Sequence, residues 1–240
     1  MNRPTLIVWK NKNRFMKKYF RDVSAIIWKD ILSEFRTREM FSSMFLLAVL
    51  ILIIFTFSID LSKVKSLDVA PGILWVSFVF AGTIGLNRSF LNEQENDCLF
   101  GMMVTPMDRS AIYVGKMIGN FIFMTIMEIF LIPVFVVFFN LSFQYIIEIC
   151  LITFMGTLGF VALGTLMSAM SASFKSREIM LPILLYPLIV PVIIASVKAT
   201  GALLHGRSLD SVMTWLKLLM VFDIIFLIAS FIIFEYIIEE

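Results

Sequence analysis

Long apolar runs, separated by short clusters of polar residues, dominate the pattern of this chain. Each run is close to the roughly 20 apolar residues that a helix needs to cross the hydrocarbon core of a bilayer. Glu128 and Asp223 are the charged residues that fall in the middle of such runs. The pattern therefore predicts six membrane-spanning helices, at residues 40–60, 70–90, 112–139, 146–170, 178–198 and 212–236.

The segment before the first predicted span has a different pattern. It predicts an amphipathic helix over residues 17–39 that lies on the cytoplasmic surface of the membrane. A target helix for a calmodulin-like protein is the alternative. Residues 1–16 are expected to form a loose basic tail, and residues 40–240 a membrane domain. Apolar side chains recur at helical spacing in this amphipathic segment, at Phe20, Val23, Ile26, Ile27, Ile31 and Phe35.

Composition excludes several classes of protein. Hydrophobic residues make up 60% of the 240 residues, charged residues only 16%, and the mean hydropathy is +0.93. A soluble chain of this length lacks the interior volume to bury so much apolar side chain. A soluble globular domain, a disordered chain and a nucleic-acid-binding module are therefore excluded. Most of the 20 Lys and Arg residues lie before the first span and in loops on the same side, which predicts cytoplasmic termini.

The loop between the second and third predicted spans, about residues 91–110, combines acidic and apolar residues. Glu93, Glu95 and Asp97 precede an apolar stretch that contains Leu99 and Phe100. Thr105 and Pro106 then favour the start of a helix, as N-cap and first helical residue. An apolar helix in a cytoplasmic loop has no contact with lipid. It is expected either to dock into a soluble partner or to pack under the helices of its own chain.

Ionisable residues and prolines inside the spans are the other candidate functional residues. Glu128 and Asp223 sit at a depth where charges are costly and often functional. Each is expected to be protonated, to pair with Lys217, or to face a polar cavity. The fifth span contains three prolines, which remove backbone donors and favour either a bent helix or a hinging, pathway-lining helix. These prolines are Pro182, Pro187 and Pro191.

Pairs of small residues predict close helix contacts, within one chain or between two copies. Gly115 and Gly119 form a GxxxG motif, and Gly164 with Ser168 forms a looser version of it.

Sequence motifs for catalysis, nucleotide binding and metal binding are missing. The chain has no P-loop, and its single histidine, His205, supports neither a catalytic triad nor a multi-histidine metal site. We therefore expect no catalytic residue, no metal and no directly bound cofactor. Any energy source must then be a partner or an ion gradient.

The loop resembles that of ABC-2-type exporter permeases. In those permeases two spaced glutamates precede an apolar segment, a Ser/Thr-Pro pair and then a Gly-Lys pair. Here these positions are Glu93 and Glu95, Thr105–Pro106 and Gly115–Lys116. The usual Gly-Thr pair is replaced by Asp97–Cys98, and a later glutamate by Phe100.

Three further segments are similar to the haem exporter B family, so the resemblance spans roughly residues 17–236. They are the charged run Lys29–Glu39, the segment Gly85–Phe90 and the proline-rich segment Arg177–Pro191. The resemblance implies an all-α, six-span ABC-2-type permease with an N-terminal interfacial helix, located in the bacterial cytoplasmic membrane. It would be the non-catalytic membrane subunit of the ABC transporter for cytochrome c maturation.

The resemblance also implies partners. A separate ATPase subunit would bind ATP and engage the loop of residues 91–110. A tryptophan-rich haem-handling membrane protein would associate with the permease, a second permease copy would complete the transporter, and a periplasmic haem chaperone would be reached indirectly. Haem is a candidate cargo. Two alternatives remain open: an ABC-2 exporter of a drug, lipid or polysaccharide, and an ion-coupled carrier that uses Glu128 and Asp223.

Overall fold

The structure is a computed structural model that describes residues 4–59, 65–95, 108–141, 146–172, 174, 176–207 and 209–237. All regular structure in these residues is helical. The helices are α1 (Pro4–Thr37), α2 (Glu39–Ser58), α3 (Ser66–Glu95), α5 (Arg109–Phe138), α6 (Ile146–Ala172), α7 (Arg177–Leu204) and α8 (Leu209–Ile237).

Six helices among the described residues are long and apolar enough to cross a membrane, which confirms the predicted spans. They are Glu39–Ser58, Leu67–Phe90, Arg109–Phe138, Ile146–Ala172, Glu178–Leu204 and Asp210–Tyr236. The largest difference from the predicted bounds is in α7, which continues past the exposed Lys198 to Leu204. A long lysine side chain at a helix end extends its ammonium toward water, so it does not end the helix.

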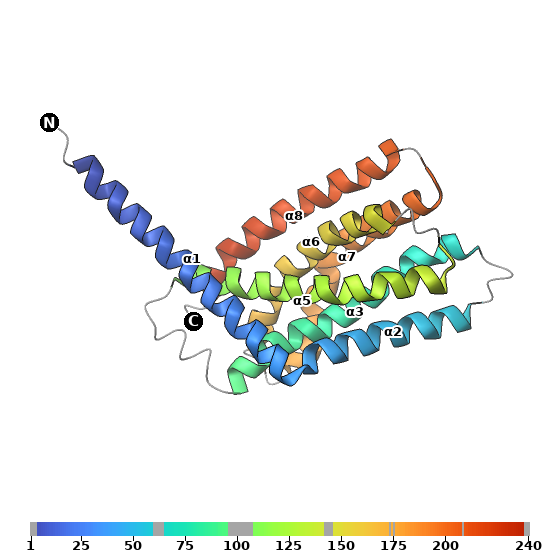
Figure 1. The fold of residues 1–240 in the computed structure, drawn as a ribbon, viewed down its shortest axis with the longest axis horizontal. Helices are drawn as coiled ribbons and strands as arrows, with labels where there is room; N and C mark the ends of the chain where they lie inside the picture. Colours follow the sequence, from blue (N-terminus) through green and yellow to red (C-terminus); the bar gives the residue numbers. More distant parts are fainter. Residues whose placement is uncertain are drawn as a thin grey trace.

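Helix α1 begins earlier than expected. Residues 4–16, predicted to be a loose basic tail, are helical and continuous with the amphipathic segment. Pro4 is compatible with this start because the first turn of a helix needs no backbone N–H donor from that residue. The helix ends at Thr37. The next residue, Arg38, has a left-handed φ of 55° and separates α1 from α2. In Figure 1, α1 crosses the bundle obliquely and carries the N-terminus away from it.

Helix α5 begins at Arg109, later than the predicted start at Thr105 and Pro106. Asp108 is its N-cap: the Asp108 carboxylate accepts hydrogen bonds from the backbone N–H of Ser110 at 3.3 Å and from its hydroxyl at 2.9 Å. Asp108 competes well with a threonine for this position because aspartate is among the preferred N-cap residues. Thr105 and Pro106 lie outside the described residues.

Helix α6 occupies the centre of the bundle. It packs against α3, α5, α7 and α8 (Figure 1), whereas α2 packs mainly against α3, and α1 lies along α5. Small residues allow these close approaches: Gly164 meets Leu86 of α3, and Gly115 of α5 meets Ile26 of α1. Both small-residue motifs of the sequence therefore serve contacts within the chain.

Candidate functional site

The ends of α3 and α5, which flank residues 96–107, are tied together by a buried lysine. Lys116 of α5 is only 2% exposed, and its ammonium donates a hydrogen bond to the backbone oxygen of Ser89 on α3 at 2.9 Å. The same ammonium lies 5.4 Å from the centre of the Phe90 ring, within the range of a cation–π interaction. Lys116 thereby fixes where the last turns of α3 stand relative to α5.

Lys116 also joins α1 to this site. Its Nζ lies 3.0 Å from Oδ2 of Asp30, and Lys29 approaches the other carboxylate oxygen at 3.3 Å. A charge buried in the protein is tolerated when it is paired and hydrogen-bonded, and both conditions are met here. We name Asp30, Ser89, Phe90 and Lys116 the lysine cluster. It joins three helices at the end of the bundle from which the predicted coupling loop emerges.

Two further contacts hold α1 along the first turns of α5. The hydroxyl groups of Ser110 and Tyr19 are 3.4 Å apart. One turn further, Ile26 packs directly on Gly115, where a Cβ would lie 2.9 Å from the Ile26 side chain. The part of α1 from Tyr19 to Asp30 is therefore attached to α5, and we expect this part of α1 to move with α5.

The opposite face of α1 presents apolar side chains outward. Phe20, Trp28, Leu32 and Phe35 are all exposed, next to the basic residues Arg21, Lys29 and Arg36. Such a pairing of apolar and basic strips is typical of a helix at a membrane surface. Of the apolar positions predicted to share one face, Val23 and Ile26 instead pack against the bundle, because α1 has a protein neighbour as well as lipid.

The predicted coupling residues lie at the last described residues of α3 or in the segment 96–107, which the structure does not describe. Glu93 and Glu95 belong to the last turn of α3. Asp97, Leu99, Phe100, Thr105 and Pro106 lie outside the described residues. The structure thus places both ends of the loop but not the docking residues themselves.

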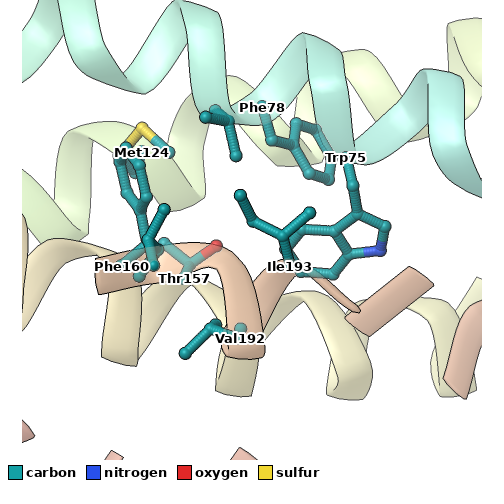
Figure 2. Close-up of a pocket in the computed structure, with 10 residues that line it drawn as sticks. Trp75, Phe78, Met124, Thr157, Phe160, Val192 and Ile193 are labelled. Carbon is teal, nitrogen blue, oxygen red and sulfur yellow. The ribbon is translucent and has the colours of Figure 1, made fainter. Parts of the chain in front are cut away.

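Glu128 is buried between α5 and α6. Its carboxylate accepts a hydrogen bond from the hydroxyl of Thr157, and the residue is 3% exposed. Thr157 also lines a small cavity of about 10 Å³ whose other walls are apolar, including Trp75, Phe78 and Phe160 (Figure 2). A cavity of this size holds one water at most. It is far too small for haem.

Asp223 of α8 is buried on the other side of α6. Its side chain lies against Gly159, at a point where no Cβ would fit, and its Oδ1 has no hydrogen-bond partner among the described residues. Residues two apart on a helix point roughly 200° apart, so Thr157 and Gly159 face opposite ways. Glu128 and Asp223 therefore approach α6 from different sides and are not brought together.

The expected partner of Asp223 is also elsewhere. Lys217 is exposed on α8, and no ion pair joins it to Asp223 or Glu128 in the described part of the chain.

The three prolines are accommodated inside α7, which is continuous from Arg177 to Leu204. Pro187 is exposed, and Pro182 and Pro191 are half-buried. The buried positions of α7 include Leu185, Ile189 and Val192, and none of the prolines lines the cavity of Figure 2. A role as hinge or pathway lining stays a prediction.

His205 joins the end of α7 to the start of α3, at the end of the bundle opposite the lysine cluster. His205, just after α7, has one ring nitrogen 2.7 Å from the Asp68 carboxylate and the other 2.8 Å from the backbone oxygen of Gly201. Both ring nitrogens are thus occupied within the chain. Among the described residues, no cluster of three or more His, Cys, Asp or Glu side chains is arranged to hold a metal ion.

Sequence reasoning missed the lysine cluster as a structural unit. The sequence motifs place Lys116 in a Gly-Lys pair and Asp30 in a charged run, but they do not bring the two residues together. The available signal was Asp30 itself: it recurs at helical spacing with Val23 and Ile26, on the face of α1 that is buried. A carboxylate in such a strip predicts a buried cation opposite, but not which one.

Comparisons with known proteins agree on one family. The family model described as "CcmB protein" matches residues 21–236. Three curated relatives are each called heme exporter protein B. The Pseudomonas aeruginosa protein is 24% identical over 147 residues, 61% of this chain and 66% of the relative. For the Bradyrhizobium diazoefficiens protein the values are 26% over 188 residues, 77% and 83%.

The Rhodobacter capsulatus protein is 25% identical over 142 residues, which is 59% of this chain and 65% of the relative. The chain therefore covers slightly less than two thirds of the length of the Pseudomonas and Rhodobacter relatives.

Proposed function

This chain belongs to the CcmB protein family, and from that membership we propose that it is the membrane-spanning subunit of a haem-exporting ABC transporter that serves cytochrome c biogenesis. The observation that carries the proposal is the extent of the family match, residues 21–236, which includes all six spans and α1 from residue 21 onward. The name that the relatives share, heme exporter protein B, supports a role in haem export.

In this proposal a separate ATPase supplies the energy. The chain has no P-loop, so ATP binds to the partner. The partner docks on the segment between α3 and α5, with Leu99 and Phe100 as apolar contacts and Glu93, Glu95 and Asp97 as charged contacts. The contact between the ends of α3 and α5 supports this mechanism, because a displacement of the segment between them would move both helices.

Through the lysine cluster, the same displacement would also move α1. Lys116 contacts α3 through Ser89 and α1 through Asp30, so the three elements shift as one body when the ATPase moves the loop. Helices joined in this way can pass a small displacement of the loop to the rest of the membrane domain. Motion of α5 against α6 would then disturb the contact between Glu128 and Thr157.

We propose that haem is not ligated by this subunit. Its single histidine already engages Asp68 and the backbone of Gly201. The cavity that Thr157 lines in the described part of the bundle is about 10 Å³. Both observations favour release of a haem-loaded periplasmic chaperone over passage of haem through the chain. A tryptophan-rich haem-handling membrane protein would then carry the haem itself.

The remaining assignments follow from the same proposal. A second copy of this chain is required because an ATPase pair needs two docking segments. The location is the bacterial cytoplasmic membrane, with both termini in the cytoplasm, as the distribution of Lys and Arg favours. The subunit is non-catalytic and binds no cofactor of its own.

The test is a stain for covalently bound haem in membranes from a strain that lacks this gene. Loss of all c-type cytochromes, restored by the gene on a plasmid, is the expected result. A strain without a second copy or a second maturation system that stains normally contradicts the proposal. That result would favour an ABC-2 exporter for a drug, lipid or polysaccharide.

A further inference from the structure

A groove of about 450 Å³ lies where α1, α2 and α5 meet, and its lining residue Glu34 is one helical turn beyond Asp30 of the lysine cluster. It is lined by Glu34, Phe35, Arg38, Phe41, Ser42, Phe123, Ile126 and Phe130. The proposed coupling mechanism uses none of these residues. The groove depends on the turn at Arg38, because the left-handed backbone there separates the end of α1 from the start of α2.

Glu34 and Arg38, which we call the polar rim, give the groove one charge of each sign. Arg38 is exposed, and its guanidinium makes no hydrogen bond or ion pair to any residue that the structure describes. Glu34 faces the same space while its Oε1 accepts a hydrogen bond from the backbone N–H of Phe41 at 2.8 Å. The nearby Glu39 is turned to Arg88 instead, at 3.4 Å. The polar rim is therefore neutral overall but strongly dipolar.

Most of the other residues that line the groove are aromatic. Phe41 packs edge-to-face on Phe130 with ring centres 6.0 Å apart. Phe35 is 72% and Phe130 56% exposed on the outer surface of a bundle that spans the membrane. The polar rim immediately precedes the first span, which begins at Glu39. The polar rim is therefore expected at the depth of the lipid headgroups, and the aromatic lining residues at the depth of the hydrocarbon.

We propose that this groove binds one zwitterionic aminophospholipid, with its phosphate on Arg38, its ammonium on Glu34 and an acyl chain along Phe41, Phe123 and Phe130. Guanidinium is well suited to phosphate because its donors form a planar fork. A primary ammonium donates charge-assisted hydrogen bonds to a carboxylate. The proposal depends on membrane insertion of the chain and not on its transport function.

Charge complementarity favours this lipid over two other possible occupants, an anionic lipid and the apolar stretch of the chain after Asp97. An anionic lipid would place its net charge beside Glu34, which repels it, whereas a headgroup with both charges satisfies both rim residues. The apolar stretch after Asp97 in the chain itself is the second rival. It offers no phosphate to the Arg38 guanidinium.

The experiment is native mass spectrometry of the full chain, released from nanodiscs that contain equal parts of phosphatidylethanolamine, phosphatidylcholine and phosphatidylglycerol. We expect phosphatidylethanolamine to be the retained lipid. Arg38→Gln should weaken its retention by about tenfold or more, as expected for the loss of a hydrogen bond between two charged groups. Glu34→Gln should remove the preference over phosphatidylcholine, whose quaternary ammonium has no N–H to donate.

Two further variants keep the test decisive if Arg38→Gln fails to fold. Ser42→Trp fills the groove without touching either charge and should abolish retention. Arg36→Gln removes an exposed arginine of α1 that does not line the groove, and it should leave retention unchanged. Equal losses in Arg36→Gln and Arg38→Gln, undiminished retention in Ser42→Trp, or a preference for phosphatidylglycerol would each overturn the proposal.

The rival within the chain has its own readout. In a background without native cysteines, Ser42→Cys and Leu99→Cys should not form a disulfide if lipid fills the groove. Efficient cross-linking between these two positions would mean that the chain's own loop is the occupant, and the lipid proposal would be wrong.

Discussion

The ammonium of Lys116 lies 3.0 Å from the carboxylate of Asp30, in a buried contact between α5 and α1. The two residues come from segments with different patterns, an apolar span and an amphipathic helix. Their contact makes α1 part of the bundle. It also places a buried charge beside the segment that we propose to contact an ATPase.

Removing one member of this pair should destabilise the chain strongly. Asp30→Asn leaves the Lys116 ammonium buried without its counter-charge, which costs about 3–5 kcal/mol for a buried pair. The double variant Asp30→Asn, Lys116→Met should lose less than the sum of the two single variants. Thermal unfolding in detergent measures all three. Additive losses would mean that the two side chains do not interact.

The attachment of α1 depends on the absence of a side chain at position 115. Gly115→Ala should push α1 away, because its Cβ would lie 2.9 Å from Ile26, and overpacking of this kind costs about 1–3 kcal/mol. Gly119→Ala is the matched control, since its nearest neighbour would be at an ordinary 3.5 Å. Protease cleavage within α1 reports the detachment. Similar cleavage in both variants would contradict the close packing seen at Gly115.

Charges on the apolar stretch of the loop should uncouple the transporter. We expect Leu99→Asp or Phe100→Asp to abolish cytochrome maturation while the protein is inserted in normal amounts, because a carboxylate cannot enter an apolar docking groove without a large desolvation cost. Covalent-haem staining and an immunoblot of membranes measure the two quantities. Full maturation together with full assembly in either variant would show that the docking assignment is wrong.

Glu128 should be replaceable by an uncharged side chain of the same shape. In Glu128→Gln the amide oxygen can still accept the hydrogen bond from Thr157, so we expect maturation within about twofold of normal and unchanged insertion, as is usual when a buried hydrogen bond is preserved. Covalent-haem staining is the measurement. Complete loss of maturation in an inserted Glu128→Gln protein would instead favour ion coupling through this carboxyl.

The junction between α1 and α2 should respond to pH through Glu34. Burial raises the pKa of Glu34 above its usual value, against the lowering effect of the hydrogen bond from Phe41. Protonated Glu34 therefore stabilises the folded chain. This contribution is complete below the ordinary glutamate pKa and is lost as pH rises through the higher pKa of the folded state. Hydrogen exchange at the start of α2 should speed up across that interval. Glu34→Gln should remove the dependence, and an unchanged pH profile would contradict it.

Much of the fold was predictable because hydropathy is a local property. Each span carries enough apolar residues to cross a membrane by itself, so α2 and α6 could be placed within two residues of their observed ends. Helix ends in water were less predictable. Asp108 rather than Thr105 precedes α5, and residues 4–16 continue α1. Several residues can cap or extend a helix, and the choice depends on what the neighbouring helix contacts.

The candidate site was predictable only in part. The sequence indicated that Glu128, Asp223 and the loop after α3 deserve a functional explanation. It did not show that Thr157 binds Glu128 or that Gly159 meets Asp223 on the other side of α6. Contacts between helices depend on rotation and register, which are set by packing of the whole bundle.

The sequence by itself determined that this is a six-span membrane protein with an amphipathic N-terminal segment, because transfer of each apolar run into lipid is favourable without reference to the others. Only the tertiary structure decided which charges are paired. It brought Lys116 to Asp30, left Arg38 at the rim of a groove, and separated Glu128 from Asp223. Pairing requires side chains from distant segments to reach the same buried point, and a linear pattern carries no distances in space.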